Sequence, residues 1–230
     1  MRTTVPLLIA LSAVVAVGCK SDPTWDAGFI EDPRILREGS ELPFHRWWVS
    51  DAYDVASYEK MLVKPLVTRT LRDVKGWDAA TLEFDRTAAV RTLARTARRT
   101  LSDAFDGVDG RLRSTPRLAE RTLVLELALI ELRPTKSWFN VLGYLITRLS
   151  FDKGRVAMEA RVTDAATGEL LMAFADREAG KATFFSVDDL TWYGHAESIF
   201  EDWAAQIAEV VATGPGAEVS DSATFTFWPF

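Results

Sequence analysis

The stretch Arg155–Glu178 limits the fold of this chain more than any other, because it carries the clearest period-two pattern in the sequence. Asp164 and Gly168 divide it at a turn, since aspartate can bond its own backbone and glycine accepts a positive φ. We therefore predict a β-hairpin, which must pair with other elements because a lone hairpin is barely stable in water. Apolar residues alternate along one face of it: Val156, Met158, Ala160, Val162, Leu170, Met172 and Phe174.

Two further segments have the period of amphipathic helices. The first begins near Asp85 and ends near Gly107, and it carries an arginine row on its polar face: Arg91, Arg95, Arg98 and Arg99. The second spans Thr191–Val211 and has an acidic polar face. Its apolar stripe consists of Trp192, Ala196, Ile199, Phe200, Trp203, Ile207, Val210 and Val211. A solvated face explains the arginine row better than a nucleic-acid or lipid site, because the chain carries a net charge of −6.

Two more segments read as strands and complete the predicted fold. Tyr58–Val67 reads as a strand in which Pro65 marks an edge or an end, and Arg121–Leu132 is apolar on both faces and therefore central. Strand, helix and strand in this order favour a right-handed parallel crossover. We predict an α+β fold, with a mixed four-stranded sheet in β-α-β-β-β-α order and two main amphipathic helices on one face.

The N-terminus has the features of a bacterial lipoprotein. Arg2 precedes an apolar run from Val5 to Val17 that is too short to span a bilayer. Small residues then lead to Cys19, the only cysteine, as at a lipobox where the signal is removed and the cysteine is lipidated. We expect a palmitate-type anchor there, the alternatives being an ordinary signal peptide with an incidental cysteine and a cytosolic core cysteine. Lys20 favours the outer membrane by the sorting rule of enteric bacteria.

These features divide the chain into four segments. We predict a signal peptide over 1–18, a lipidated tether and cap over 19–50, a single α/β domain over 51–213 and a C-terminal tail over 214–230. Aromatic residues such as Phe29 and Trp47 indicate that the tether packs along the domain, because a flexible leash would be rich in glycine and serine.

The segment Trp138–Phe151 has an apolar face formed by Trp138, Leu142, Leu145 and Leu149, together with Val141. The simpler interpretation is a connector helix that covers one end of the sheet. The alternative is an exposed contact patch for a partner or for the membrane surface.

The common catalytic arrangements are not found in the sequence, and two histidines with one cysteine make a metal site unexpected. We predict no catalytic residue, no metal and no cofactor. His195 has Ser186 and Asp188 nearby, so an envelope hydrolase is the alternative. The run Trp192, Tyr193, Gly194 and His195 opens the last predicted helix, and we interpret it more economically as a packing and capping device.

Several short runs together carry a resemblance. They are Glu159-Ala160-Arg161, Asp164 to Glu169, Phe174 to Glu178 and Thr191 to Ala196, with weaker matches at Gly28-Phe29-Ile30 and Tyr58-Glu59-Lys60. In this combination the chain resembles a family of Gram-negative envelope lipoproteins known as a domain of unknown function. The likeness covers roughly residues 28–212 and implies a lipid-anchored protein with no known enzyme activity. Near residues 140–150 the chain departs from the family, with a bulky Trp/Leu/Tyr stretch in place of a Gly-rich insert.

We therefore expect a lipid-anchored protein of the cell envelope, on the outer membrane and facing the periplasm. Its predicted role is a non-catalytic binding or assembly module with the membrane and an envelope protein as partners, and without nucleic acid. The polar hairpin face with Glu159, Arg161 and Thr163 is a candidate contact surface. An assembly factor whose tail pairs with a barrel or secretion complex is a further alternative. The oligomeric state does not follow from the sequence.

Overall fold

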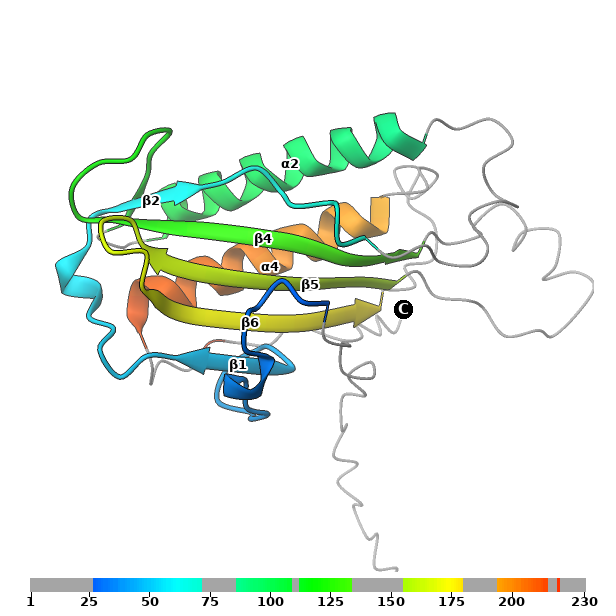
Figure 1. Cartoon of the computed structure of the whole chain (residues 1–230). Helices are drawn as coiled ribbons and strands as arrows, with labels where there is room; N and C mark the ends of the chain where they lie inside the picture. The colour runs from blue at the N-terminus through cyan, green and yellow to red at the C-terminus, as the bar shows by residue number, and fades with distance from the viewer. Residues whose placement is uncertain are drawn as a thin grey trace, which may run out of the picture.

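The computed structural model describes residues 27–71, 86–108, 112–133, 155–179, 194–214 and 219. These residues form one mixed sheet of six strands in the order β1-β6-β5-β4-β2-β3, with two α-helices on one of its faces (Figure 1). The strands are β1 Arg46–Val49, β2 Lys60–Val63, β3 Arg113–Ser114, β4 Thr122–Arg133, β5 Arg155–Asp164 and β6 Leu170–Ala179. The helices are α2 Arg86–Gly107 and α4 Gly194–Thr213, and two short 3-10 turns cover Pro33–Ile35 and Val55–Ser57.

The predicted hairpin is confirmed and lies inside the sheet. Strands β5 and β6 pair antiparallel, and β4 and β1 flank them on either side. The alternation holds except at Leu170, which packs on the opposite face from Met172. The reason is a bulge, because the register shifts by one residue at Leu171.

The sheet has six strands where the sequence predicted four. The two missed strands are β1, which lies within the segment predicted as a tether, and β3, which has two residues. Both are too short to show a period, and each is held by a longer neighbour: β1 by β6 and β3 by β2. The predicted parallel pairing of β2 with β4 is confirmed, and β2 ends at Val63, before Pro65.

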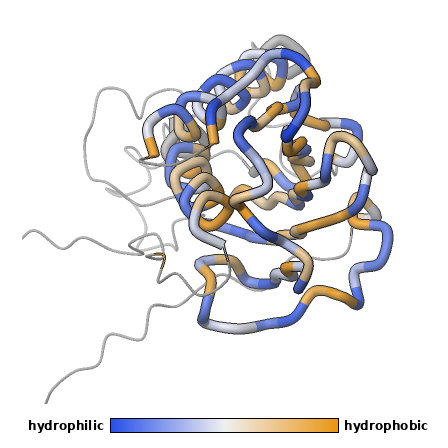
Figure 2. The backbone as a smooth tube through the Cα atoms, turned by 90° about the vertical axis from the view of Figure 1, so that its left-hand side faces the viewer, coloured by the Kyte–Doolittle hydropathy of each residue, from blue (hydrophilic) through white to orange (hydrophobic). Residues whose placement is uncertain are grey.

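The main core lies between the sheet and the two helices. Helix α4 presents its apolar stripe to the sheet, and Phe200, Trp203 and Ile207 are buried there. Strand β4 is covered on both faces as predicted, since Leu127 faces the helices while Ala128 joins a second cluster on the opposite face. Figure 2 shows hydrophobic and hydrophilic positions alternating around the helical tubes, as amphipathic packing requires.

Backbone groups at both edges of the sheet have partners. At the β1 edge, Arg37 and Trp47 exchange two backbone hydrogen bonds of 3.0 Å, and the Arg37 guanidinium lies 3.9 Å from the Trp47 ring centroid. At the opposite edge, Arg98 of α2 donates from Nε to the Val63 carbonyl at 3.1 Å. These contacts occupy groups that could otherwise pair with another chain.

Within the described ranges, no helix combines the length and the apolar character needed to cross a membrane.

Candidate functional site

The chain's own N-terminal segment, residues 27–45, begins on the face of the sheet opposite the helices and ends in the helix-side core, where Leu42 and Phe44 are buried. In Figure 1 the dark-blue beginning of this segment lies in front of β5 and β6, while α2 and α4 lie behind the sheet. Phe29 and Ile30 are buried in a small cluster with sheet residues from β4, β5 and β6: Ala128, Ile130, Ala157 and Ala173. Burial of two large apolar side chains contributes about 1.5–3 kcal/mol each, so this segment belongs to the folded body.

Glu159 of β5 holds the start of this segment. Its side chain is buried, and the carboxylate accepts hydrogen bonds from the backbone N–H groups of Ala27 at 3.0 Å, Phe29 at 3.2 Å and Ile30 at 3.3 Å. Gly28 has a φ of 74°, a left-handed conformation that glycine adopts without strain. That turn directs neighbouring N–H groups toward one point, and such a nest of amides binds anions. We call this arrangement the Glu159 clamp.

Charged residues beside the clamp form ion pairs with one another, and one of them also contacts the Phe29 ring. Arg161 donates from Nε to Glu126 at 2.7 Å, and Lys64 donates to the same carboxylate at 2.9 Å. The Arg161 guanidinium also lies 4.9 Å from the centroid of the Phe29 ring, within cation–π range. The interpretation of this face as an open contact surface is therefore wrong at Glu159, because the N-terminal segment already covers it.

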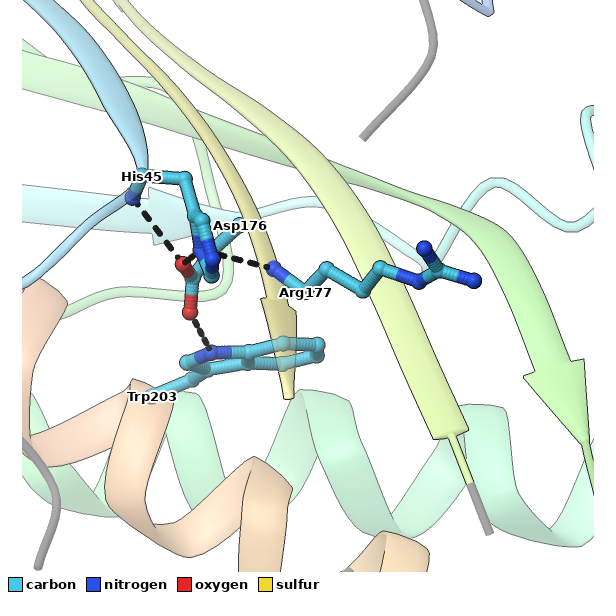
Figure 3. Close-up of polar contacts among 4 residues, drawn as sticks. All are labelled: His45, Asp176, Arg177 and Trp203. Atoms are coloured by element: carbon cyan, nitrogen blue, oxygen red, sulfur yellow. Dashed lines mark hydrogen bonds and ion pairs between the residues drawn. The ribbon is translucent and has the colours of Figure 1, made fainter. Parts of the chain in front are cut away.

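Asp176 of β6 holds the other end of the segment on the helix-facing side (Figure 3). Its buried carboxylate accepts from the His45 backbone N–H at 3.0 Å and from Trp203 Nε1 of α4 at 2.7 Å. The His45 ring nitrogen Nδ1 also contacts Asp176 Oδ1, and the Arg177 backbone nitrogen lies 3.4 Å from Nδ1. Asp176 thereby joins the N-terminal segment to helix α4.

The two carboxylates therefore hold one segment from opposite faces of one hairpin. In the β5–β6 ladder Glu159 pairs with Ala175, and Asp176 pairs with Met158, so the two acids are close in register but point to opposite sides. Arg177 lies on the same face as Glu159, and its guanidinium makes a 2.8 Å ion pair with Glu131. Figure 3 shows the Arg177 side chain directed away from the Asp176 carboxylate.

A third contact joins Tyr58, just before β2, to the hairpin turn. The Tyr58 hydroxyl donates to Asp164 Oδ2 at 2.8 Å, and its ring stacks on Tyr53 with centroids 6.2 Å apart. Burial and the Asp164 carboxylate raise the pKa of Tyr58 to about 12. Backbone N–H groups of the turn, with the Thr167 amide first, and the Tyr58 hydroxyl lower the pKa of Asp164.

These contacts hold distant parts of the chain together. Both oxygens of Asp176 accept hydrogen bonds, and Asp176 has 0% exposure. A general base must reach a substrate proton, directly or through one water molecule. Among the described residues, no group of three or more His, Cys, Asp or Glu side chains could hold a metal ion.

Most of the site residues predicted from sequence lie outside the described ranges. This applies to the lipidation site Cys19, to the patch of Trp138, Leu142, Leu145 and Leu149, and to Trp192 and Tyr193. Gly194 and His195 begin helix α4, as the sequence predicted. The His195 side chain and its suggested partners Ser186 and Asp188 are likewise outside the description, so the hydrolase alternative stays a prediction.

Sequence reasoning missed His45 and the role of Glu159. One signal was present for Asp176, since it continues the buried alternation of Met172 and Phe174, and a carboxylate at such a position requires donors. The backbone donors lie about 130 positions earlier in the chain, and the Trp203 donor lies 27 positions after Asp176. The short runs that carry the family resemblance contain these contacts, because Phe29 meets Glu159 and Tyr58 meets Asp164.

Among solved structures, the chain has weak matches from several bacteria. A PelC dodecamer from Paraburkholderia phytofirmans is 13% identical over 73% of this chain and 95% of its own, with a TM-score of 0.41. Protein XCC0632 from Xanthomonas campestris is 11% identical over 71% of this chain and 89% of its own, also at 0.41. Lipoprotein GNA1162 from Neisseria meningitidis is 13% identical, covers 57% of this chain and 88% of its own, and has a TM-score of 0.23.

No curated protein sequence matches this chain. A family model does match it, over residues 26–207, and its description is "Protein of unknown function (DUF3313)". The matched range begins beside the Glu159 clamp and ends within helix α4, so it includes both buried carboxylates and all their donors.

Proposed function

The chain belongs to the DUF3313 family of proteins of unknown function, and from this premise we propose that it is a lipid-anchored envelope protein. In this proposal Cys19 carries the lipid, and the domain faces the periplasm from the outer membrane. The domain acts by binding, as a non-catalytic module in an envelope assembly. The Glu159 clamp is the observation that carries this proposal.

The clamp supports the proposal because it fixes the chain only eight positions after Cys19. An extended chain spans at most about 3.6 Å per residue, so Ala27 can stand no more than about 29 Å from the lipidated residue. Without the clamp the first fixed point would be Arg37, which pairs with Trp47, and the same limit would be about 65 Å. The clamp thus keeps the domain close to the bilayer, and an anchored binding module requires such a defined position.

The internal contacts also favour binding over catalysis. Glu159, Asp176 and Asp164 each accept hydrogen bonds from a distant segment of the chain. Their carboxylates are used to position the N-terminal segment, helix α4 and the loop before β2. Partner contacts would then be made by other surfaces of the domain, outside the clamp.

Fractionation of cells that express the full chain tests the anchor. Cys19→Ala should remain unlipidated, and it should leave the membrane fraction after a high-salt wash. Lys20→Asp is the matched control, because it changes the next residue and keeps the lipidated cysteine. By the enteric sorting rule it should stay membrane-bound but move to the inner membrane. Retention of washed Cys19→Ala in the membrane fraction would show that lipidation is not the anchor.

A pull-down from solubilised membranes tests the binding role. Wild-type protein should enrich a defined envelope protein, and Cys19→Ala should enrich less of it because it is not held at the membrane. A complementation assay with His195→Gln tests the hydrolase alternative. If that variant is folded and lipidated but fails to complement a deletion strain, the non-catalytic proposal is wrong.

A further inference from the structure

The outer surface of the helix layer carries two rows of opposite charge side by side. Helices α2 and α4 pack against each other on the same face of the sheet. The exposed positions of α2 are basic from Arg91 to Arg99 and acidic further on, at Asp103 and Asp106, whereas those described in α4 are acidic or small. Neither row takes part in the Glu159 clamp or the Asp176 site.

The basic row of α2 consists of Arg91, Arg95 and Arg99, all exposed and spaced by four residues. This spacing places them in one line about 12 Å long, at 1.5 Å of rise per residue. Within the described ranges no carboxylate pairs with any of the three, and Arg95 contacts only Thr92 of its own helix. Like charges four residues apart destabilise an isolated helix, so helix stability does not account for the row.

The acidic row of α4 has the same spacing. It consists of the exposed residues Glu201, Ala205 and Glu209, and the residues between Ala205 and Glu209 are buried. The two glutamates are separated by eight residues, as Arg91 and Arg99 are. The carboxylates therefore span about 12 Å, equal to the span of the arginines.

We propose that a second copy of this chain docks on the helix layer, with α2 of each copy over α4 of the other. Figure 1 shows that α2 and α4 both begin at the same end of the sheet. A two-fold axis parallel to the helices would therefore place the basic row over the acidic row with matched direction. Such an interface is isologous, so each copy supplies both rows and both contacts form twice.

Charge complementarity favours a second copy over an anionic membrane as the occupant. A flat anionic surface would attract the α2 row but repel Glu201 and Glu209 beside it.

The surface area that the two helices offer is adequate for a weak dimer. Helices about 30 Å long and about 10 Å apart offer about 600 Å² per copy, near the lower limit for specific interfaces. The described surface adds no large apolar patch there, so the dimer is salt-sensitive.

Variants that reverse the charges of one row or the other test the proposal. They are made in the full chain and measured in detergent. Wild-type protein should sediment as a dimer in low salt and dissociate as the salt concentration rises. Arg91→Glu/Arg99→Glu and Glu201→Arg/Glu209→Arg should each weaken self-association at least about tenfold, because like charges then face each other. An equimolar mixture of the two variants should associate again, since every facing pair is then complementary.

Arg69→Glu/Arg117→Glu is the matched control, because both arginines are exposed in loops outside the helix layer. It reverses the same number of charges and should leave the dimer intact. Thermal unfolding of each variant checks that its fold is retained.

Disulfide trapping provides a second measurement that does not depend on charge. A chain with Arg95→Cys and a differently tagged chain with Ala205→Cys should cross-link, whereas Leu118→Cys paired with Ala205→Cys should not. The proposal is wrong if wild-type protein is monomeric in low salt, or if the mixed charge variants fail to associate. It is also wrong if loss of the arginine row removes binding to anionic vesicles without changing the oligomeric state.

Discussion

Substitution of Glu159 should release the start of the N-terminal segment from the sheet while the rest of the domain stays folded. In Glu159→Ala the backbone N–H groups of Ala27, Phe29 and Ile30 lose their acceptor in a buried site. An unsatisfied buried donor costs about 1–3 kcal/mol, so three of them would cost about 3–9 kcal/mol if the segment stayed in place. Detachment avoids that cost.

The cost of detachment sets the size of the effect. Phe29 and Ile30 would leave their cluster, which loses about 1.5–3 kcal/mol for each side chain. The protein either keeps the segment in place with unsatisfied donors or releases it, and the response with the lower free-energy cost prevails. We therefore expect a destabilisation of about 3–6 kcal/mol. Glu159→Gln keeps one carbonyl acceptor and should cost less than Glu159→Ala.

Hydrogen exchange measured by mass spectrometry separates local release from general destabilisation. Glu159→Ala should expose the amides of residues 27–30 with little change in β4 and β5. Glu169→Gln is the matched control, since Glu169 is an exposed acid in the same hairpin. Unchanged protection of residues 27–30 in Glu159→Ala, with an unchanged unfolding midpoint, would refute the role assigned to the carboxylate.

Three further predictions concern the contacts around the clamp. Trp203→Phe removes the donor to Asp176 and should cost about 1–3 kcal/mol, while Trp203→Ala should cost about 3–5 kcal/mol in denaturant unfolding. Gly28→Ala should cost about 1–2 kcal/mol, measured by thermal unfolding, because only the positive φ opposes it and no atom lies near the new Cβ. The pKa of Tyr58 is raised from 10.0 to about 12, so its contribution should be complete below pH 10 and lost as the pH rises toward 12. Tyr58→Phe should therefore flatten the alkaline decline in a series of unfolding midpoints, and an unchanged decline would contradict that assignment.

The elements with a long hydrophobic period could be predicted from the sequence. The hairpin, strand β4 and helices α2 and α4 appear where the pattern placed them, because their buried faces repeat over ten residues or more. Strands β1 and β3 have four and two residues, and no period can be read from so few positions. Their places are determined by backbone pairing with β6 and β2, which is a tertiary effect.

The candidate site could be predicted only in part for a similar reason. The sequence placed Glu159 on the polar face of the hairpin, and an exposed polar face is the usual outcome for such a strand. Its burial depends on a segment about 130 residues earlier that folds across the sheet. The short runs of the family resemblance contained both halves of this contact, and the family of unknown function is confirmed by the match over residues 26–207.

The central claim is that the Glu159 clamp holds the domain at the membrane. A measurement of the height of the domain above the bilayer tests this claim most directly. The lipidated full chain, labelled with a donor dye at Thr167→Cys in the exposed hairpin turn, would be placed in vesicles that contain an acceptor lipid. Energy transfer should be strong for this protein and should fall when Glu159→Ala is added, because Arg37 is then the first fixed residue and the free tether lengthens from about 29 Å toward about 65 Å. Equal transfer in the two proteins would contradict a clamp that holds the domain at the membrane.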